Sequence, residues 1–344
     1  MKFGLLKYDY GIYKYAIGSN LGDEIQSIAA SYFLPKIDCF IDRESIKKNN
    51  IILPREKIKV IMNGWYMHDW KQWSPHNSIE PLFISVNLSN KKFIANIFSS
   101  QNINYLIKHA PIGARDLYTL NLLQRNNIPS YFSGCLTLTL PKNKNIVRQD
   151  YILCIDVDKN IVEKLKKHSN KKIFEFSTNF PYQYLKSMER FKYALGLLKA
   201  YQSASAVITS RLHAAMPCLA LETPVLLVRD FKKYDGRFDG LGDLVRKADN
   251  KFYFNNIDYF DVNNLEPNSN AYLQYRNALI KKCEDFTGQK QRYISPIAQI
   301  ESLEEQLVSN LEIIHNFTEK NLIINFHIGI LIKKLQSLKN SYIF

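Results

Sequence analysis

The chain has 344 residues, of which 46% are hydrophobic and 13% are aromatic. This length predicts two domains, and the apolar content is enough for sizeable cores, which excludes wholesale disorder. The 46 Lys and Arg residues against 32 Asp and Glu residues give a net charge of +14. That balance favours anionic partners, although the dispersed lysines also suit an ordinary solvated surface.

The cysteines and the N-terminus bear on the cellular compartment. The five cysteines are odd in number and far apart, with no C-x-x-C, which argues against a disulfide framework or a zinc site and for a reducing compartment. The N-terminus has no apolar core of signal-peptide length, and no window reaches the roughly 18 uncharged apolar residues of a spanning helix. We expect a cytoplasmic protein, with peripheral contact at the inner face of the cell membrane as an open alternative.

Strand-like and helix-like segments alternate along the first half of the chain. Helices are predicted to begin near Asp23 and at Asp116, and strands are predicted over 1–8, 57–65, 81–88 and 130–140. A polar, basic stretch, 141–150, interrupts the pattern and is the predicted linker.

The alternation resumes after the linker. Strands are predicted over 151–158, 171–177, 205–210 and 224–228, with helices over 160–168, 182–203 and 211–222. Alternation in both halves predicts two α/β domains with parallel sheets. We expect an N-terminal domain over 1–147 and a C-terminal domain over 148–295. In such sheets ligands bind beyond the carboxyl ends of strands or between domains.

Residues 296–344 have a different pattern. An acidic segment with helical spacing of apolar residues is followed by a basic, strongly apolar stretch that is too short to span a membrane. We expect a helical extension. It either lies in a membrane interface or docks on the protein's own body or on a second subunit.

The segment TSRLH, residues 209–213, places an arginine and a histidine inside an otherwise apolar run. Arg211 and His213 follow a predicted strand and begin a predicted helix, where free N–H groups and the helix dipole favour anions. A guanidinium there can bind a carboxylate or phosphate through two parallel hydrogen bonds. A histidine can move a proton near neutral pH. This pair is the candidate catalytic site, with a buried structural role as the alternative.

The segment TSRLHAAMPCLALETPVLLV resembles the signature of the polysaccharide pyruvyl transferase family. Three further segments fit the same family in the same order: SNLGDEIQSIAA, IGARD and SGCLTLTL. Together they cover most of residues 1–245. The segments after about residue 246, and residues 64–87, have no match.

The resemblance implies two Rossmann-like domains similar to B-type glycosyltransferases, with the active site in the cleft between them. It implies transfer of pyruvate from phosphoenolpyruvate to two hydroxyls of one sugar as a cyclic ketal, in the synthesis of a cell-surface polysaccharide such as a capsule or exopolysaccharide. By position, Arg211 and His213 match the family's donor-binding and catalytic pair, and Arg115 matches a second arginine. No metal and no cofactor are expected. The partners would be phosphoenolpyruvate and a sugar or lipid-linked oligosaccharide acceptor.

Further candidates for substrate binding lie around these motifs: Asn20, Gly22, Asp23, Ser210 and Arg237. Gly22 would allow a tight turn before a helix, and Asp23 would either bind the acceptor or only stabilise the helix start. Arg237 belongs to a basic loop that would meet phosphate or form a solvated charge run.

Two other motifs allow opposite interpretations. Asp156 and Asp158 imitate the metal-binding Asp-x-Asp of other glycosyltransferases, but no other ligand cluster accompanies them, and we do not expect a metal there. Trp65, Trp70 and Trp73 lie in one aromatic-rich stretch that would stack on a sugar or pack in the core.

Two alternative functions fit parts of the same pattern. A metal-independent glycosyltransferase of the same fold, using a nucleotide sugar, would also hold phosphate with an arginine. A nucleic-acid-binding protein would fit the net charge. No recognised nucleic-acid motif is present and the basic residues are dispersed, so we expect no nucleic-acid partner.

Overall fold

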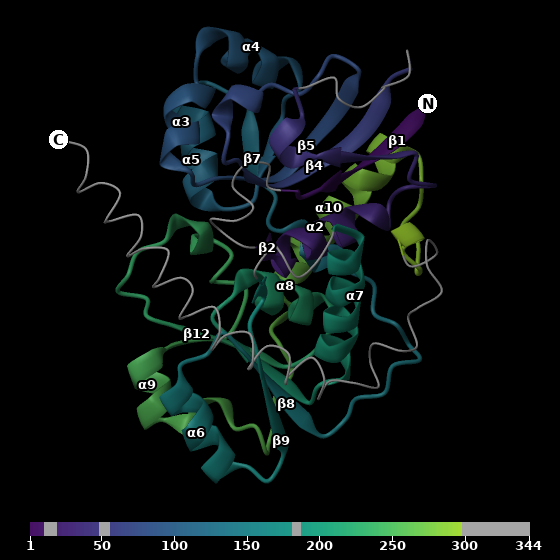
Figure 1. Ribbon diagram of the computed structural model, residues 1–344. Coiled ribbons are helices and arrows are strands. Elements are labelled where there is room, and N and C mark those ends of the chain that lie inside the picture. Colours follow the sequence, from purple (N-terminus) through teal and green to yellow (C-terminus); the bar gives the residue numbers. More distant parts are fainter. Residues whose placement is uncertain (10–18, 48–55, 181–186, 298–344) are drawn as a thin grey trace, which may run out of the picture.

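A computed structural model describes residues 1–9, 19–47, 56–180 and 187–297 (Figure 1). Two sheets are built from parallel strands, with helices between successive strands. The first sheet has the order β3-β1-β4-β5-β6-β7, with β1 (Lys2–Lys7), β3 (Cys39–Asp42), β4 (Ile58–Tyr66), β5 (Ile79–Leu88), β6 (Ile112–Ala114) and β7 (Ser130–Phe132). The second has the order β13-β12-β11-β8-β9, with β8 (Tyr151–Ile155), β9 (Lys172–Phe176), β11 (Ala206–Thr209), β12 (Val225–Arg229) and β13 (Lys247–Asp249). The predicted α/β fold with two parallel, Rossmann-like sheets is confirmed.

The helices fall into outer and central groups (Figure 1). The outer helices are α3 (Lys91–Ile97), α4 (Ser100–Lys108) and α5 (Leu117–Arg125) at the first sheet, and α6 (Lys159–His168) and α9 (Asn250–Asn255) at the second. The central ones, between the sheets, are α2 (Leu21–Ser31), α7 (Ser187–Ser203), α8 (Leu212–Ala220) and α10 (Leu273–Thr287). Short 3₁₀ helices are η2 (Arg43–Ser45), η3 (Trp70–Gln72), η4 (Leu136–Thr139), η6 (Gly236–Phe238), η7 (Ile257–Phe260) and η8 (Asn270–Tyr272).

The central helices join the two sheets through one continuous core. Every residue of α2 is buried, as is every residue of β8 and β11. Strands that are covered on both faces have unbroken apolar sequences, and this pattern is why strands of the second sheet could be predicted from the sequence. One hydrophobic cluster contains Leu5 of the first sheet, Ile25 of α2 and Val207 of the second sheet. The relative position of the two sheets is therefore set by side-chain packing.

A short two-stranded ribbon also crosses between the halves. β2 (Ser19–Asn20) pairs antiparallel with β10 (Asn179–Phe180), and the Leu21 N–H donates to the Thr178 carbonyl at 2.9 Å. This ribbon brings the start of α2 against the second sheet.

Helix α10 belongs to the predicted C-terminal residues 148–295 but packs on the first sheet. Lys59 Nζ donates to the Phe286 carbonyl at 2.7 Å, and the rings of Phe132 and Tyr275 are 5.1 Å apart. The predicted linker, 141–150, has no helix or strand. Of the predicted extension over 296–344, only Pro296 and Ile297 are among the described residues.

Three local predictions differ from the structure. The predicted strand 130–140 is only Ser130–Phe132, and its alternating LTLT segment is the 3₁₀ helix η4, which packs on α8 and α10. A short alternating apolar run that is buried on several sides is compatible with either a strand or a short helix. β3 and β13 were not predicted. Helix α2 begins at Leu21, so Gly22 lies inside its first turn rather than before it.

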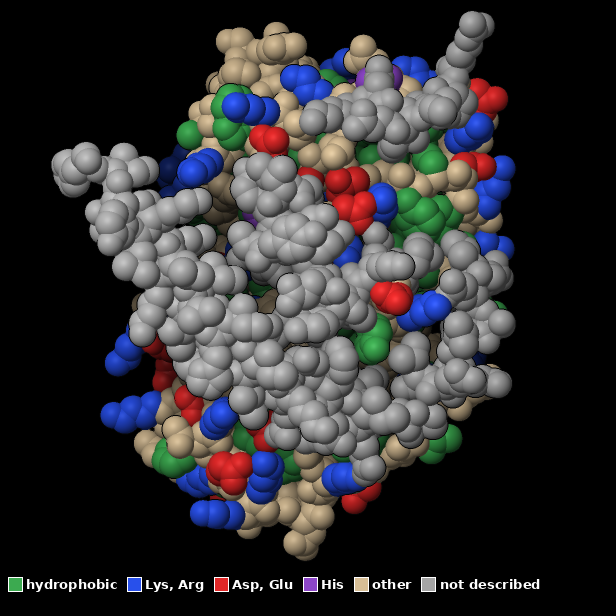
Figure 2. Space-filling model, viewed as in Figure 1, with side chains coloured by type: hydrophobic (Ala, Val, Ile, Leu, Met, Phe, Trp, Pro, Cys, Tyr) green, Lys and Arg blue, Asp and Glu red, His purple; other side chains and the backbone are tan. Residues whose placement is uncertain are grey.

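The surface matches the dispersed charge of the sequence. Figure 2 shows Lys and Arg side chains scattered among acidic ones over the visible part of this face. Within the described ranges, no helix has the length and apolar character needed to cross a bilayer.

The three tryptophans of the aromatic-rich stretch have different environments. Trp73 is 5% exposed, and its ring centroid lies 5.6, 5.7 and 5.5 Å from those of Tyr66, Phe83 and Phe93. Trp65 Nε1 donates to Ser89 Oγ at 2.9 Å, whereas Trp70 is 40% exposed. Core packing is thus the observed role of Trp73.

We predict that Trp73→Ala destabilises the protein strongly because it leaves a large cavity among aromatic rings. Truncating a buried aromatic costs about 3–5 kcal/mol, which corresponds to a fall in melting temperature of at least about 6 °C. The matched control Trp70→Ala should change the melting temperature by no more than about 2 °C, since it removes an exposed ring. Equal melting curves for the two variants would contradict this placement.

Candidate active site

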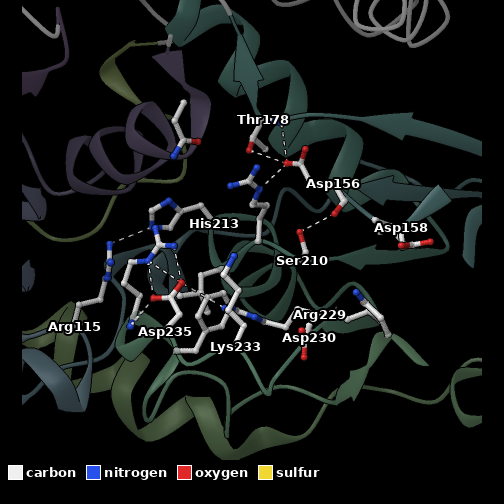
Figure 3. Close-up of a pocket in the computed structure, with 18 residues that line it drawn as sticks. Arg115, Asp156, Asp158, Thr178, Ser210, His213, Arg229, Asp230, Lys233 and Asp235 are labelled. Atoms are coloured by element: carbon white, nitrogen blue, oxygen red, sulfur yellow. Dashed lines mark hydrogen bonds and ion pairs between the residues drawn. The ribbon is translucent and has the colours of Figure 1, made fainter. Parts of the chain in front are cut away.

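A cavity of about 480 Å³ lies where the two sheets face each other (Figure 3). Its lining follows the carboxyl ends of β8, β11 and β12 in the second sheet and of β6 in the first. This is where parallel α/β sheets bind ligands. The lining is strongly charged, with five cationic side chains (Arg115, Arg211, Arg229, Lys233, Arg237) and four carboxylates (Asp156, Asp158, Asp230, Asp235).

The Arg-x-His segment has the local structure that the sequence predicts. β11 ends at Thr209, whose Oγ1 accepts a hydrogen bond from the Arg211 N–H at 2.9 Å. Arg211 has extended backbone angles and is the N-cap of α8, which leaves His213 in the first turn of the helix. Both side chains line the cavity, together with Ser210.

His213 meets Arg115 across the two halves of the molecule (Figure 3). Arg115 Nη1 lies 3.4 Å from His213 Nε2. Because a guanidinium can only donate, Nε2 must accept, and the ring proton sits on Nδ1. Burial, followed by the charges of Arg115, Arg237 and Arg211, lowers the pKa of His213 well below its usual value. In this arrangement the imidazole is neutral at physiological pH.

Gly22 determines how closely α2 approaches His213. A Cβ at position 22 would lie 2.4 Å from His213 Nδ1 and 2.8 Å from His213 Cβ. Asn20 caps α2 by accepting the Gly22 N–H on Oδ1 at 3.0 Å, and it also lines the cavity. Gly22 itself does not line the cavity. Its observed role is to let the helix contact the imidazole.

Asp23 lies beside the cavity rather than in its lining. It is 7% exposed, and its Oδ2 is 3.4 Å from Arg43 Nη1. Gln26, which the sequence did not single out, donates to Asp23 Oδ1 at 3.4 Å and accepts from Arg115 Nη1 at 3.4 Å. Asp23 is therefore connected to the cavity through Gln26, one turn further along α2.

The two aspartates of the Asp-x-Asp motif have separate structural roles. Asp156 Oδ2 accepts a hydrogen bond from Arg211 Nε at 2.7 Å, and Asp158 caps α6 by accepting the Asn160 N–H at 2.8 Å. Among the described residues, no group of three or more His, Cys, Asp and Glu side chains is arranged to hold a metal ion. The sequence interpretation considered this motif only as a metal site and missed the contact with Arg211.

Asp235 is a further cavity residue that the sequence analysis missed. It forms two hydrogen bonds with Arg237, at 2.9 Å to Nε and 2.6 Å to Nη2, and its Oδ2 is 3.6 Å from Arg229 Nη1. The loop that carries it contacts α5, since the Leu117 N–H donates to the Asp239 carbonyl at 3.1 Å. The only sequence signal was an acidic residue close to the basic residues of this segment.

The structure thus gathers most of the predicted residues around one imidazole. The guanidinium groups of Arg115, Arg211 and Arg237 all act on the charge of His213, and Asn20 and Ser210 share the same cavity. Three cations in one cavity suit a small molecule with more than one negative group. An anion bound among them would offset part of their charge and so raise the pKa of His213.

Comparison with known proteins identifies a family for most of this region. A protein-family model described as polysaccharide pyruvyl transferase matches residues 20–229. The matched region begins at the cap of α2 and ends at the last residue of β12. The matched region includes the cavity-lining residues Asn20, Arg115, Ser210, Arg211 and His213. No curated protein sequence matches the chain.

We predict that Gly22→Ala displaces His213, because the new methyl group would overlap the imidazole and its Cβ. Overpacking of this kind costs about 1–3 kcal/mol. The melting temperature should fall and the His213 ring resonances in NMR spectra should move. As a control, Gly242→Ala meets its nearest atom at 3.2 Å and should leave those resonances unchanged. Wild-type resonances in Gly22→Ala would refute the close approach of α2.

Proposed function

The chain belongs to the polysaccharide pyruvyl transferase family, and we propose that it transfers pyruvate from phosphoenolpyruvate to two hydroxyls of one sugar as a cyclic ketal. The observation that carries the proposal is the set of three guanidinium groups around His213 in a cavity between the two sheets. Phosphoenolpyruvate bears a carboxylate and a phosphate, which match these cations.

The reaction would proceed in balanced steps. A proton adds to C3 of the donor, and C2 becomes cation-like. One sugar hydroxyl forms a C–O bond to C2 and loses its proton. Phosphate then leaves C2 with the electron pair of its C–O bond, and a second hydroxyl of the same sugar adds to C2 and loses its proton. The products are the ketal and inorganic phosphate.

The arginines would hold the donor from both sheets. Arg115 follows β6 of the first sheet and Arg211 follows β11 of the second, so a donor between them would contact both halves. Arg211 uses Nε for Asp156, and it would therefore bind the anion through its two terminal nitrogens. Arg237 adds a third cation, steered by Asp235. Together they would stabilise the charge that develops as phosphate leaves.

His213 would be the proton donor for C3. It begins neutral because burial and three cations lower its pKa. The bound donor would offset those charges, raise the pKa of the ring and draw Arg115 Nη1 away from Nε2, which would then take up the proton. His213 would thus become an acid only when the donor is bound.

The acceptor would approach from the side of α2, where Asn20 lines the cavity, and Asp23 would act only through Gln26. We propose a sugar or lipid-linked oligosaccharide of cell-surface polysaccharide assembly as the acceptor. The reaction would take place in the cytoplasm. Membrane contact or self-association through 296–344 belongs to the same proposal, and this segment lies almost wholly outside the described residues.

We expect phosphoenolpyruvate to raise the melting temperature, since a ligand that binds only the folded state stabilises it. Incubation with phosphoenolpyruvate and a panel of sugar acceptors should yield, by mass spectrometry, the mass increment of a pyruvyl ketal. The yield should survive excess chelator, because no metal enters the proposed steps.

Two outcomes would redirect the proposal. Stabilisation by nucleotide sugars and not by phosphoenolpyruvate would favour a glycosyltransferase of the same fold. Loss of turnover in chelator, with recovery on adding a divalent ion, would show that a metal takes part.

We compare the number of protons taken up when phosphoenolpyruvate binds near neutral pH. The wild type should take up close to one proton more than His213→Gln. Glutamine keeps a hydrogen bond but cannot carry the proton. Calorimetry in buffers of different ionisation enthalpy measures the difference, and the protonation of the donor itself cancels between the two proteins. Turnover in the variant should fall by roughly 10²–10⁴. Equal proton uptake, or an active variant, would remove His213 as the acid.

A further inference from the structure

Asp156 has a backbone conformation that side chains rarely adopt. Its φ is 54°, in the left-handed region, where aspartate and asparagine are the best tolerated residues other than glycine. It follows β8 directly, and its N–H donates to the Phe176 carbonyl at 2.9 Å. Such conformations persist where surrounding contacts hold them in place, and they cluster at functional sites.

Asp156 contacts Arg211 and the neighbouring Ser210, which Figure 3 shows beside it. Its Oδ2 is 2.7 Å from Arg211 Nε, and its carbonyl accepts the Ser210 hydroxyl at 2.7 Å. The carboxylate side chain is 16% exposed, whereas the arginine side chain is 37% exposed. Both side chains line the cavity, the carboxylate is the more buried of the two, and the contact uses Nε, which leaves the two terminal nitrogens of the guanidinium for other groups.

Thr178 connects this contact to the other half of the molecule. Its N–H and Oγ1 both lie 3.4 Å from Asp156 Oδ2, and its carbonyl accepts the Leu21 N–H at 2.9 Å. Leu21 is the first residue of α2, whose next residue, Gly22, contacts His213. The orientation of Arg211 and the position of α2 are thus linked through one threonine.

We propose that Asp156 is a positioning residue that holds Arg211 through Nε, so that its two terminal nitrogens face an anionic group of the donor. The kinetic part of this proposal rests on the proposed pyruvyl transfer. A carboxylate in an anion-binding cavity opposes anion binding by its charge. The orientation of Arg211 explains why Asp156 is there, since misplacing a substrate-holding group by about 1 Å can lower the rate on the order of 10²-fold.

The test separates orientation from charge and from folding. Asp156→Asn keeps the shape and tolerates the left-handed backbone, but it lacks the charge that strengthens the hydrogen bond. We expect kcat to fall by on the order of 10²-fold, while KM for phosphoenolpyruvate stays the same or decreases. A purely structural residue would lower the melting temperature and leave both constants of the folded enzyme unchanged.

A spectroscopic readout makes the test independent of the reaction. In NMR spectra of labelled arginine, the Nε–H signal of Arg211 is identified by its loss in Arg211→Lys. We expect this signal to be shifted downfield and to exchange slowly in the wild type, and to move upfield and exchange faster in Asp156→Asn. If the wild type forms no ketal, the proposed function fails, and this signal still decides whether Asp156 holds Arg211.

Two further variants complete the design. Asp249→Asn is the matched control, because Asp249, like Asp156, lies at the carboxyl end of a strand of the second sheet, where it caps α9, but it is outside the cavity lining. It should behave as the wild type. Thr178→Val removes one contact to Asp156 and should show a smaller change in the same direction, which keeps the test decisive if Asp156→Asn folds poorly. An unmoved Arg211 signal together with wild-type kcat and KM in Asp156→Asn would overturn the proposal.

Discussion

The contact between Gly22 and the imidazole of His213 is the constraint on which the rest of the site depends. A side chain at position 22 would overlap the ring, so only glycine allows α2 to lie against the first turn of α8. The β2–β10 ribbon fixes the start of α2, and the burial of every residue of α2 fixes the rest of the helix, so the contact is held in place. Arg115, which follows β6 of the first sheet, consequently reaches His213 of α8 at 3.4 Å.

Each of the three arginines around His213 has a carboxylate partner. Asp116 lies 3.7 Å from Arg115, Asp156 lies 2.7 Å from Arg211, and Asp235 lies 2.6 Å from Arg237. An arginine has five N–H donors in a rigid fork, so one carboxylate orients the group and still leaves donors for a ligand. These pairs offset part of the repulsion among three neighbouring cations. Burial, followed by the remaining positive charge, lowers the pKa of His213 well below its usual value.

Local patterns predicted the elements whose environment is uniform along their length. β8, β11 and β12 are apolar runs because both faces are covered, and Asp116 was identified as the start of α5 because it caps that helix with its own side chain. The segment 136–139 was misread as a strand, since alternation alone cannot distinguish a strand from a short helix that is buried on several sides. The short strands β3 and β13, of four and three residues, carry too few positions for a pattern to emerge.

The sequence by itself determined the α/β class with two parallel sheets, the turn that presents Arg211 and His213, and the resemblance that the family model supports. These depend on residues close together in the chain, where periodicity, caps and spacing act. Only the tertiary structure decided that Gly22 lies against the imidazole, that Asp156 pairs with Arg211, and that Gln26 and Asp235 contact the arginines of the site. Residues 26 and 115 meet across 89 positions of chain, and the lowered pKa of His213 follows from its burial and from the charges of Arg115 and Arg237, which are distant in the sequence, together with that of Arg211. Charge and contact across such separations exist only once the sheets have packed, so no local pattern encodes them.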